Sequence, residues 1–222
     1  PHQTSWGVST RMIGGIIMTH GDDNGLVLPP RIAPTQVIVL PIAQHKPGVI
    51  EKAQELIDRL RAAGLRVKGD FSDNSPGWKF AEYEMKGIPL RIEIGPKDME
   101  KNQCMTCRRD NGEKTIVSLD ELETAVPQLL DAVQAGLFEK AKANLDSHIF
   151  EAHSLEEAKA LQEEKGGFIK TMWCGDLECE MAMKEKAGMT SRCMPFEQDE
   201  IDEVCPICGK KAKHMIYWGV AY

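Results

Sequence analysis

The chain has no apolar run long enough to cross a bilayer. Its longest runs, near residues 12–18 and 37–43, fall far short of the roughly 20 residues that a membrane-spanning helix needs, and the first residues carry no signal-peptide pattern. An excess of basic residues is also missing, because 27 Lys and Arg face 34 Asp and Glu, for a formal charge of −7. The sequence therefore argues against a membrane protein. It argues mildly against nucleic-acid binding, although a few basic and polar groups on one face can still recognise splayed bases.

The common local motifs of catalytic sites are absent as well. The six histidines are scattered, and there is no nucleophile-base-acid triad, no GxxxxGK phosphate loop and no paired-carboxylate motif. What the 222 residues do provide, with 42% apolar and 27% charged residues, is material for one or two packed domains. Seven cysteines without a secretory signal favour a reducing compartment, such as the cytoplasm, and metal ligation rather than disulfides.

Two short-spaced cysteine pairs form the strongest physical signal. Cys174 and Cys179 are spaced C-x4-C, and Cys205 and Cys208 are spaced C-x2-C and followed by glycine. Such pairs bring four thiolates to about 2.3 Å from one ion, the closed tetrahedral arrangement of a structural Zn²⁺ site. The alternative is four buried cysteines without a ligand. Cys193 lies between the pairs and could compete as a ligand, but we predict that it is a small buried apolar residue.

The middle of the chain alternates strand and helix patterns. Strands are predicted at 35–42, 65–68, 88–94, 103–109 and 114–117, and helices at 47–63, at 77–86 and from 118 onwards. This order predicts an α/β domain with a mixed five-stranded sheet flanked by helices. Pro127 is expected to kink or restart the last helix, and a separate charged helix at 138–147 is expected to leave the domain. Further on, the patterns predict a helix at 154–164, a strand at 168–173 and an anchored apolar strand at the end of the chain.

Cys104 and Cys107 form a third C-x2-C pair, on the predicted strand 103–109. Residues three apart in a strand point to opposite faces, so one ion cannot readily hold both. We predict that they are packing residues, with a second metal site or a redox pair as the alternative.

The stretch HQTSWGVSTRMIGGIIMTHGDD opens the chain and predicts a buried apolar helix that Ser9 or Thr10 caps. The pair Gly14-Gly15 suggests another backbone packed close by. Arg11 stands at the front of this helix, where a guanidinium is normally engaged by an anion. A core carboxylate is one candidate for that anion.

TSWGVSTR, the helix after it and THGDDNGLVLPPRIAP resemble the third signature motif of class II aminoacyl-tRNA synthetases. The sequence of this stretch is similar to that of prolyl-tRNA synthetases with a C-terminal zinc domain, and the chain also matches the paired cysteines of that domain. The resemblance implies that Arg11 is catalytic and contacts the ATP phosphates, with Mg²⁺ as a further cofactor. It also implies that His2, Trp6 and Gly7 line the proline pocket and that the terminal Tyr222 lies near the aminoacylation centre.

RIEIGPKDMEKNQCMTCRRDNGEK looks like part of the anticodon-binding domain shared by the synthetases for proline, threonine, histidine and glycine. The resemblance implies that the anticodon is contacted by Glu93, Lys97, Asp98, Arg108 and Arg109. The proline anticodon carries two guanines, whose Watson-Crick edges donate to a carboxylate and whose O6 and N7 accept from arginine. Without the resemblance, these residues would be only a solvated rim.

We therefore expect the C-terminal part of a class II synthetase, since Pro1 is not an initiator methionine. Residues 1–31 would end the catalytic core, 32–137 would form the anticodon-binding domain, and 138–222 would form linker helices and a small α+β zinc-binding domain. The parent would activate proline with ATP, transfer it to tRNA(Pro) and form a homodimer. Because the first two class II motifs are missing, these residues alone should bind tRNA weakly or not at all and should not aminoacylate. The alternatives are a non-catalytic tRNA-binding accessory module, a zinc-scaffolded interaction domain, and a threonyl or histidyl relative.

Overall fold

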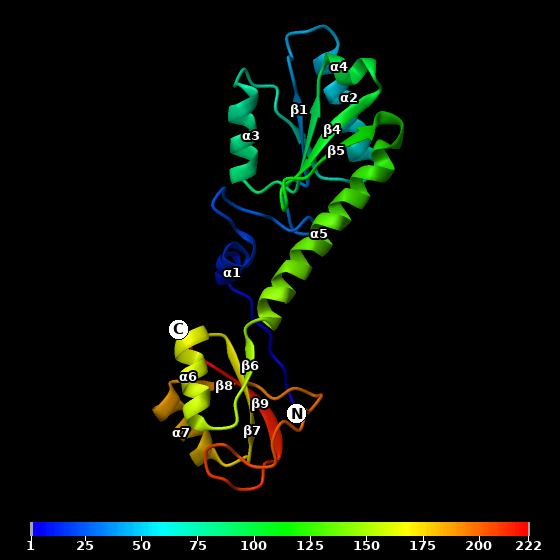
Figure 1. The fold of residues 1–222 in the computed structure, drawn as a ribbon. Helices are drawn as coiled ribbons and strands as arrows, with labels where there is room; N and C mark the ends of the chain where they lie inside the picture. Colours follow the sequence, from blue (N-terminus) through cyan, green and yellow to red (C-terminus); the bar gives the residue numbers. More distant parts are fainter. Residues whose placement is uncertain (1, 222) are drawn as a thin grey trace. The chain divides into compact units, whose positions relative to one another are not determined.

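A computed structural model describes residues 2–221, which form two compact units (Figure 1). The first unit extends to Ala141 and the second begins at Lys142. None of the helices in the described part of the chain is long and apolar enough to cross a membrane.

The first unit is built on a five-stranded sheet with the strand order β2-β1-β3-β4-β5. Strand β1 is parallel to β2 and β3, and β4 is antiparallel to β3 and β5, so the sheet is mixed, as predicted. The strands are β1 (Val37–Pro41), β2 (Val67–Gly69), β3 (Leu90–Ile94), β4 (Gln103–Arg108) and β5 (Lys114–Ser118). The helices are α1 (Arg11–His20), α2 (Val49–Ala62), α3 (Pro76–Met85), α4 (Pro96–Glu100), η1 (Leu119–Glu121) and α5 (Leu122–Asp146).

The two faces of this sheet are covered unequally. Helix α2 and the first turns of α5 bury one face, where Leu56, Ile92 and Val126 are fully buried in one apolar cluster. Each such side chain stabilises the fold by about 1.5–3 kcal/mol relative to an exposed one. Helix α3 lies on the other side of the sheet, near β1 (Figure 1). On this far side, Ile116 of β5 is exposed and Met105 of β4 is half-buried, whereas the Arg91 and Glu93 side chains of β3 are only 14% and 15% exposed.

Helix α5 is one continuous helix, so the expected restart at Pro127 and the separate helix at 138–147 are both wrong. Pro127 is the sixth residue of α5, and its missing N–H removes a single hydrogen bond, to the carbonyl four residues earlier. Beyond it, Val133 and Leu137 remain buried with Val27, which continues the apolar stripe of the helix. This packing outweighs the cost of one proline near the start of the helix.

Helix α1 forms where the sequence predicts it, directly after Thr10, but its expected burial is wrong. Met12 and Ile13 are each 60% exposed, and Met18 is 83% exposed. A Cβ atom at Gly14 or Gly15 would meet nothing within 4 Å. A ten-residue helix is marginal by itself in water, so its apolar side requires a packing partner that the described residues do not supply.

The second unit is a four-stranded sheet with the order β6-β7-β9-β8 and two helices. Its elements are β6 (Ile149–Glu151), α6 (Leu155–Lys165), β7 (Phe168–Trp173), α7 (Leu177–Ala187), β8 (Thr190–Cys193) and β9 (His214–Gly219). Strand β9 lies between β7 and β8, which confirms that the apolar strand predicted near the end of the chain is anchored. Trp218 is fully buried there, and its indole Nε1 donates to Oγ1 of Thr171 at 2.8 Å.

Candidate functional site

Four cysteines of the second unit converge on one point. Cys174 follows β7, Cys179 lies in the first turn of α7, and Cys205 and Cys208 lie in the turn before β9. All four Sγ atoms lie within 4.8 Å of one another. The turn is tight because the N–H of Gly209, at φ +71°, donates to the carbonyl of Cys205 at 2.8 Å.

The spacing of these sulfurs fits a tetrahedral metal ion. Sγ of Cys174 lies 3.6 Å from Sγ of Cys179 and 3.7 Å from Sγ of Cys208. Thiolates about 2.3 Å from a central Zn²⁺ would be about 3.8 Å apart along the edges of the tetrahedron. Burial raises the pKa of the Cys174 and Cys179 thiols, whereas the N–H of Lys210 lowers the pKa of Cys208. A divalent cation would supply the positive charge that buried thiolates require.

The other cysteines lie outside this cluster. Cys193 is exposed on β8, so the prediction that it is buried is wrong. It stands where the pairing of β8 with β9 is irregular, and a side chain there need not alternate inwards. Cys104 is fully buried in the core of the first unit, and Cys107 is half-buried on the opposite face of β4, as the three-residue spacing predicts.

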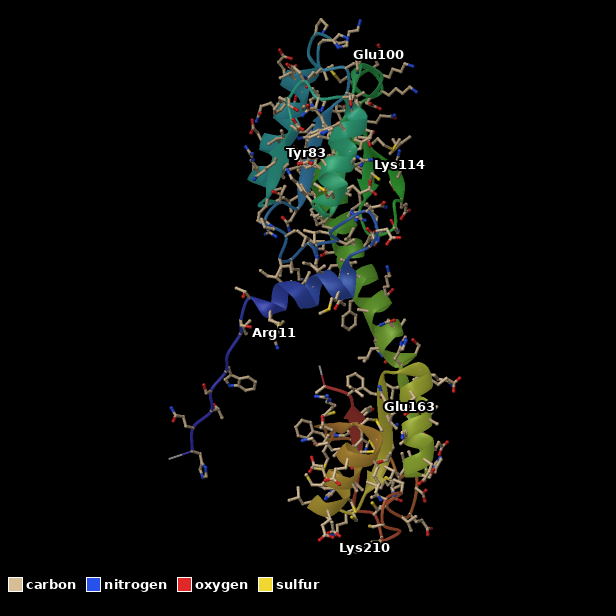
Figure 2. The ribbon with its side chains drawn as sticks, turned by 90° about the vertical axis from the view of Figure 1, so that its left-hand side faces the viewer. Arg11, Tyr83, Glu100, Lys114, Glu163 and Lys210 are labelled. Atoms are coloured by element: carbon tan, nitrogen blue, oxygen red, sulfur yellow. The ribbon has the colours of Figure 1, made fainter. Side chains whose placement is uncertain are left out.

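The residues of the opening segment are exposed and are not gathered into a pocket. His2, Trp6, Gly7 and Arg11 all lie on the surface, and Trp6 is 92% exposed. Figure 2 shows Arg11 at the start of α1. Within the described residues, no carboxylate forms an ion pair with Arg11, so the core acid considered as its partner is not found there. Tyr222 lies outside the described residues.

The five residues expected at the anticodon do not form one cluster. Glu93, Lys97 and Asp98 lie at or beyond the end of β3, whereas Arg108 pairs with Leu90 at its start. A strand rises about 3.3 Å per residue, so the two groups are on the order of 10 Å apart. The Asp98 carboxylate accepts a hydrogen bond from the Gly95 N–H at 3.0 Å, and this structural role occupies one of its oxygens.

Arg108 and Arg109 are both held by internal partners. Arg108 donates to the carboxylate of Asp110 at 3.0 and 2.6 Å and to the carbonyl of Ala132 on α5. Arg109 is 9% exposed and donates to both carboxylate oxygens of Asp22, at 2.7 and 2.6 Å. These hydrogen bonds lower the pKa of Asp22 to about 2.

The face of the sheet opposite α2 carries two rows of side chains, which we call the open face. Directly opposed residues in antiparallel strands share a face. One row therefore consists of Glu93, Met105 and Ile116, and the other of Arg91, Cys107 and Lys114.

The chemistry of the open face is mixed. Ile116 is 57% exposed, and Met105 is half-buried. Arg91 donates to Glu93 at 2.9 Å, and its guanidinium lies 4.1 Å from the centre of the Phe80 ring of α3. A hollow of about 470 Å³ opens beside the second row, with Tyr83 and Cys107 in its wall. Such a face combines apolar area, a carboxylate and cations, which is what the recognition of splayed bases requires.

Comparisons with known proteins cover both units. The family model described as "Anticodon binding domain" matches residues 36–129, and the one described as "Prolyl-tRNA synthetase, C-terminal" matches residues 155–222. The chain is 60% identical over 221 residues to proline–tRNA ligase of Clostridium novyi (strain NT) and 58% identical over 221 residues to that of Lachnoclostridium phytofermentans (strain ATCC 700394 / DSM 18823 / ISDg). The chain belongs to the prolyl-tRNA synthetase family. Each match covers all of this chain and 46% of the relative, so the chain spans about half the length of these prolyl-tRNA synthetases.

The family match gives the open face a context. The region matched as an anticodon-binding domain contains all five strands of the first sheet and therefore the open face. Sequence reasoning singled out Glu93 from this face but missed Arg91, Met105 and Ile116. The signal was present, because IPLRIEI alternates and places Arg91 and Glu93 on the same side of β3.

Proposed function

We propose that this chain is the tRNA-reading part of a proline–tRNA ligase, in which the whole protein activates proline with ATP and transfers it to tRNA(Pro). The observation that carries the proposal is the open face of the mixed sheet, which lies inside the region matched as an anticodon-binding domain. The prolyl C-terminal match favours this function over that of a threonyl or histidyl relative.

The anticodon guanines are read on the open face. The Glu93 carboxylate accepts hydrogen bonds from the N1–H and N2–H groups of a guanine, because these donors lie on its Watson-Crick edge. Met105 and Ile116 provide apolar surface against which a splayed base packs, and Lys114 and Lys97 lie where they attract backbone phosphate. The Arg91–Glu93 hydrogen bond and the Arg91–Phe80 stack hold the carboxylate in place.

The opening segment belongs to the catalytic core in this proposal. Arg11 contacts the ATP phosphates, Mg²⁺ neutralises part of their charge, and His2, Trp6 and Gly7 line the proline pocket beside Tyr222. The exposure of α1 supports this, since its uncovered apolar residues suit a helix that packs against the remainder of a longer chain. We further propose a homodimer formed through that remainder.

The four clustered cysteines hold a structural Zn²⁺ in this proposal. Two sulfur-sulfur distances near the edge length of a tetrahedron support it, and four thiolates leave no open position for substrate. Cysteines that remain unoxidised are typical of proteins in a reducing compartment, which favours the cytoplasm.

The proposal is tested by binding of tRNA(Pro) and of a version with both anticodon guanines replaced, at one stated salt concentration because the phosphate contribution depends on salt. We expect weak binding to the isolated 222 residues that falls about tenfold for each replaced guanine. Equal binding of both RNAs would refute anticodon reading and favour a zinc-scaffolded interaction domain.

A second measurement concerns catalysis. The isolated 222 residues should form no prolyl-tRNA, whereas a chain that also carries the N-terminal region of its relatives should form it. A longer chain that binds the anticodon yet never activates proline would favour the accessory-module alternative.

A further inference from the structure

Arg109 connects its own segment, directly after β4, with two segments that lie elsewhere in the sequence, residues 84–89 and Asp22. Its backbone N–H donates to the carbonyl of Pro89 at 2.9 Å, and its Nε donates to the carbonyl of Glu84 at 2.8 Å. Its two terminal nitrogens donate to the two carboxylate oxygens of Asp22, 87 residues earlier. The side chain is 6% exposed, so its donors face protein rather than solvent. Three of the five guanidinium N–H donors are engaged inside the protein, and the low exposure of the side chain leaves little room for a base to reach the other two.

Asp22 is the second residue after the end of α1, the helix that begins with Arg11. Its carboxylate also accepts a hydrogen bond from the Asn24 N–H at 2.9 Å, and Asp22 pairs with Gly25 in a β-bridge. The ion pair therefore fixes the turn that directly follows the C-terminal end of α1.

The segment after Asp22 lies flush against the end of α3. Leu26 N–H donates to the carbonyl of Met85 at 3.0 Å, and Leu28 N–H donates to that of Gly87 at 3.1 Å. A Cβ atom on Gly25 would lie 2.6 Å from the backbone of Met85, and one on Gly87 would lie 2.5 Å from that of Leu26. The backbones thus approach as closely as glycine permits, and the Arg109–Asp22 pair closes the end of this contact nearest α1.

Arg109 also continues directly from β4, the strand that carries Met105 and Cys107 of the open face. The pair therefore links the open face with the helix that carries Arg11, through one strand and one turn.

We propose that Arg109 and Asp22 are positioning residues that hold α1 at a fixed place relative to the RNA-reading sheet, so that RNA bound there is presented correctly to the aminoacylation centre. The inference rests on the proposed function. It assigns Arg109 to the alignment of the two sites and not to the anticodon contacts that the sequence resemblance implies. Misplacement of reacting groups by about 1 Å costs on the order of 100-fold in rate, so holding the C-terminal end of α1 in place has a large effect on the rate of transfer to tRNA.

A matched control exists in the same unit. Arg59 donates to both carboxylate oxygens of Glu123, at 2.6 and 2.8 Å, and to the carbonyl of Leu119 at 2.6 Å. This pair joins α2 to α5, on the side of the sheet opposite the open face, and does not involve α1. The Arg59–Glu123 pair has the same bidentate geometry as the Arg109–Asp22 pair, but it does not lie at the end of α1.

The test uses a chain that includes the N-terminal region of the relatives, with the variants Asp22→Asn, Arg109→Lys and Glu123→Gln. Thermal unfolding, ATP–pyrophosphate exchange with proline but without tRNA, and kcat and KM for tRNA charging are measured for each. We expect Asp22→Asn and Arg109→Lys to lower the kcat of charging at least about tenfold. The KM for tRNA and the exchange rate should remain unchanged. Glu123→Gln should lower thermal stability to a similar extent and leave both rates intact.

Each other outcome would overturn the inference. Unchanged charging by Asp22→Asn, or an equal loss in exchange and charging, would reduce the pair to a structural role. A raised KM for tRNA in Arg109→Lys, without one in Asp22→Asn, would mean that Arg109 contacts the RNA. A wild-type chain without proline-dependent exchange would refute the proposed function itself, and the inference with it.

Discussion

If the cysteine cluster holds Zn²⁺ as we propose, removal of the ion should unfold the second unit and leave the first intact. A structural Zn²⁺ contributes roughly 10–16 kcal/mol to the folding of small metal-binding domains at neutral pH. The apolar core of this unit is small, with eight fully or nearly buried residues: Ala152, Leu155, Ala158, Ile169, Met183, Met189, Ile216 and Trp218. A core of this size in a unit of about 80 residues supplies only about 3–5 kcal/mol. The free energy lost with the ion is therefore larger than the free energy that the apolar core contributes to folding.

Tryptophan provides the readout, because the two units differ in the burial of their indoles. Trp218 is fully buried and Trp173 is half-buried in the second unit, whereas Trp78 and Trp6 of the first are 49% and 92% exposed. A chelator under reducing conditions should red-shift the emission and abolish the near-UV circular dichroism of the buried indoles. One thermal transition should then disappear while the other remains. Addition of Zn²⁺ should restore both signals.

The matched variants are Cys205→Ser and Cys193→Ser. Cys205 is 1% exposed and belongs to the cluster, and Cys193 is exposed and lies outside it. The first change should abolish stoichiometric metal binding and reproduce the chelator effect, and the second should do neither. If the chelated protein retained both transitions, or if Cys205→Ser still bound one ion per chain, the reasoning from sulfur geometry to folding would be wrong.

Three further predictions concern single side chains. The pKa of Asp22 is about 2 in the folded protein and 3.8 ordinarily, so its contribution to the free energy of unfolding is complete above about pH 4 and is lost as the pH falls towards 2. Urea unfolding at several acidic pH values should show this contribution disappearing in the wild type, whereas Asp22→Asn should lack it at every pH. Thr171→Val leaves the indole N–H of Trp218 without its acceptor in the core and should cost about 1–3 kcal/mol in denaturant unfolding of the second unit, while a loss near zero would contradict the burial argument. Glu93→Gln should weaken binding of the guanine-containing anticodon stem-loop about tenfold. The change Glu100→Gln, at an exposed residue of α4 (Figure 2), should not weaken it, and equal effects would assign Glu93 to the solvated rim.

The first sheet could be predicted from sequence because its strands carry local patterns. The run TQVIVLPI is apolar on both faces, IPLRIEI alternates, and Asn111-Gly112 marks the hairpin between β4 and β5. Strand β7 has the same bounds as predicted, 168–173. Helix α4, β6 and β8 were missed, and they have only five, three and four residues, which gives a periodic pattern little length to show itself. Helix α7 was also missed, although it has eleven residues.

The burial of α1 could not be predicted because amphipathic and apolar patterns describe a helix but not its partner. Met12, Ile13 and Ile17 are apolar enough for a core helix, and they remain exposed since no described segment lies against them. The continuity of α5 was missed for a related reason. Pro127 is a local signal against a helix, and the apolar stripe that overrides it extends beyond the local window.

The neighbouring Arg108 and Arg109 define where prediction of the site from sequence ends. Both stand in RRD at the end of a strand, and adjacent residues there leave on opposite sides. Arg108 turns towards α5 and pairs with Asp110, a partner two residues away that the sequence displays. Arg109 turns towards α3 and pairs with Asp22, and nothing in the local sequence points to a carboxylate 87 residues earlier. Local charge pairs can therefore be inferred from sequence, whereas an arginine that joins distant segments looks like a free basic residue until the fold is known. An arginine in such a turn should be assigned to nucleic acid only after internal carboxylates from distant segments have been excluded as its partners.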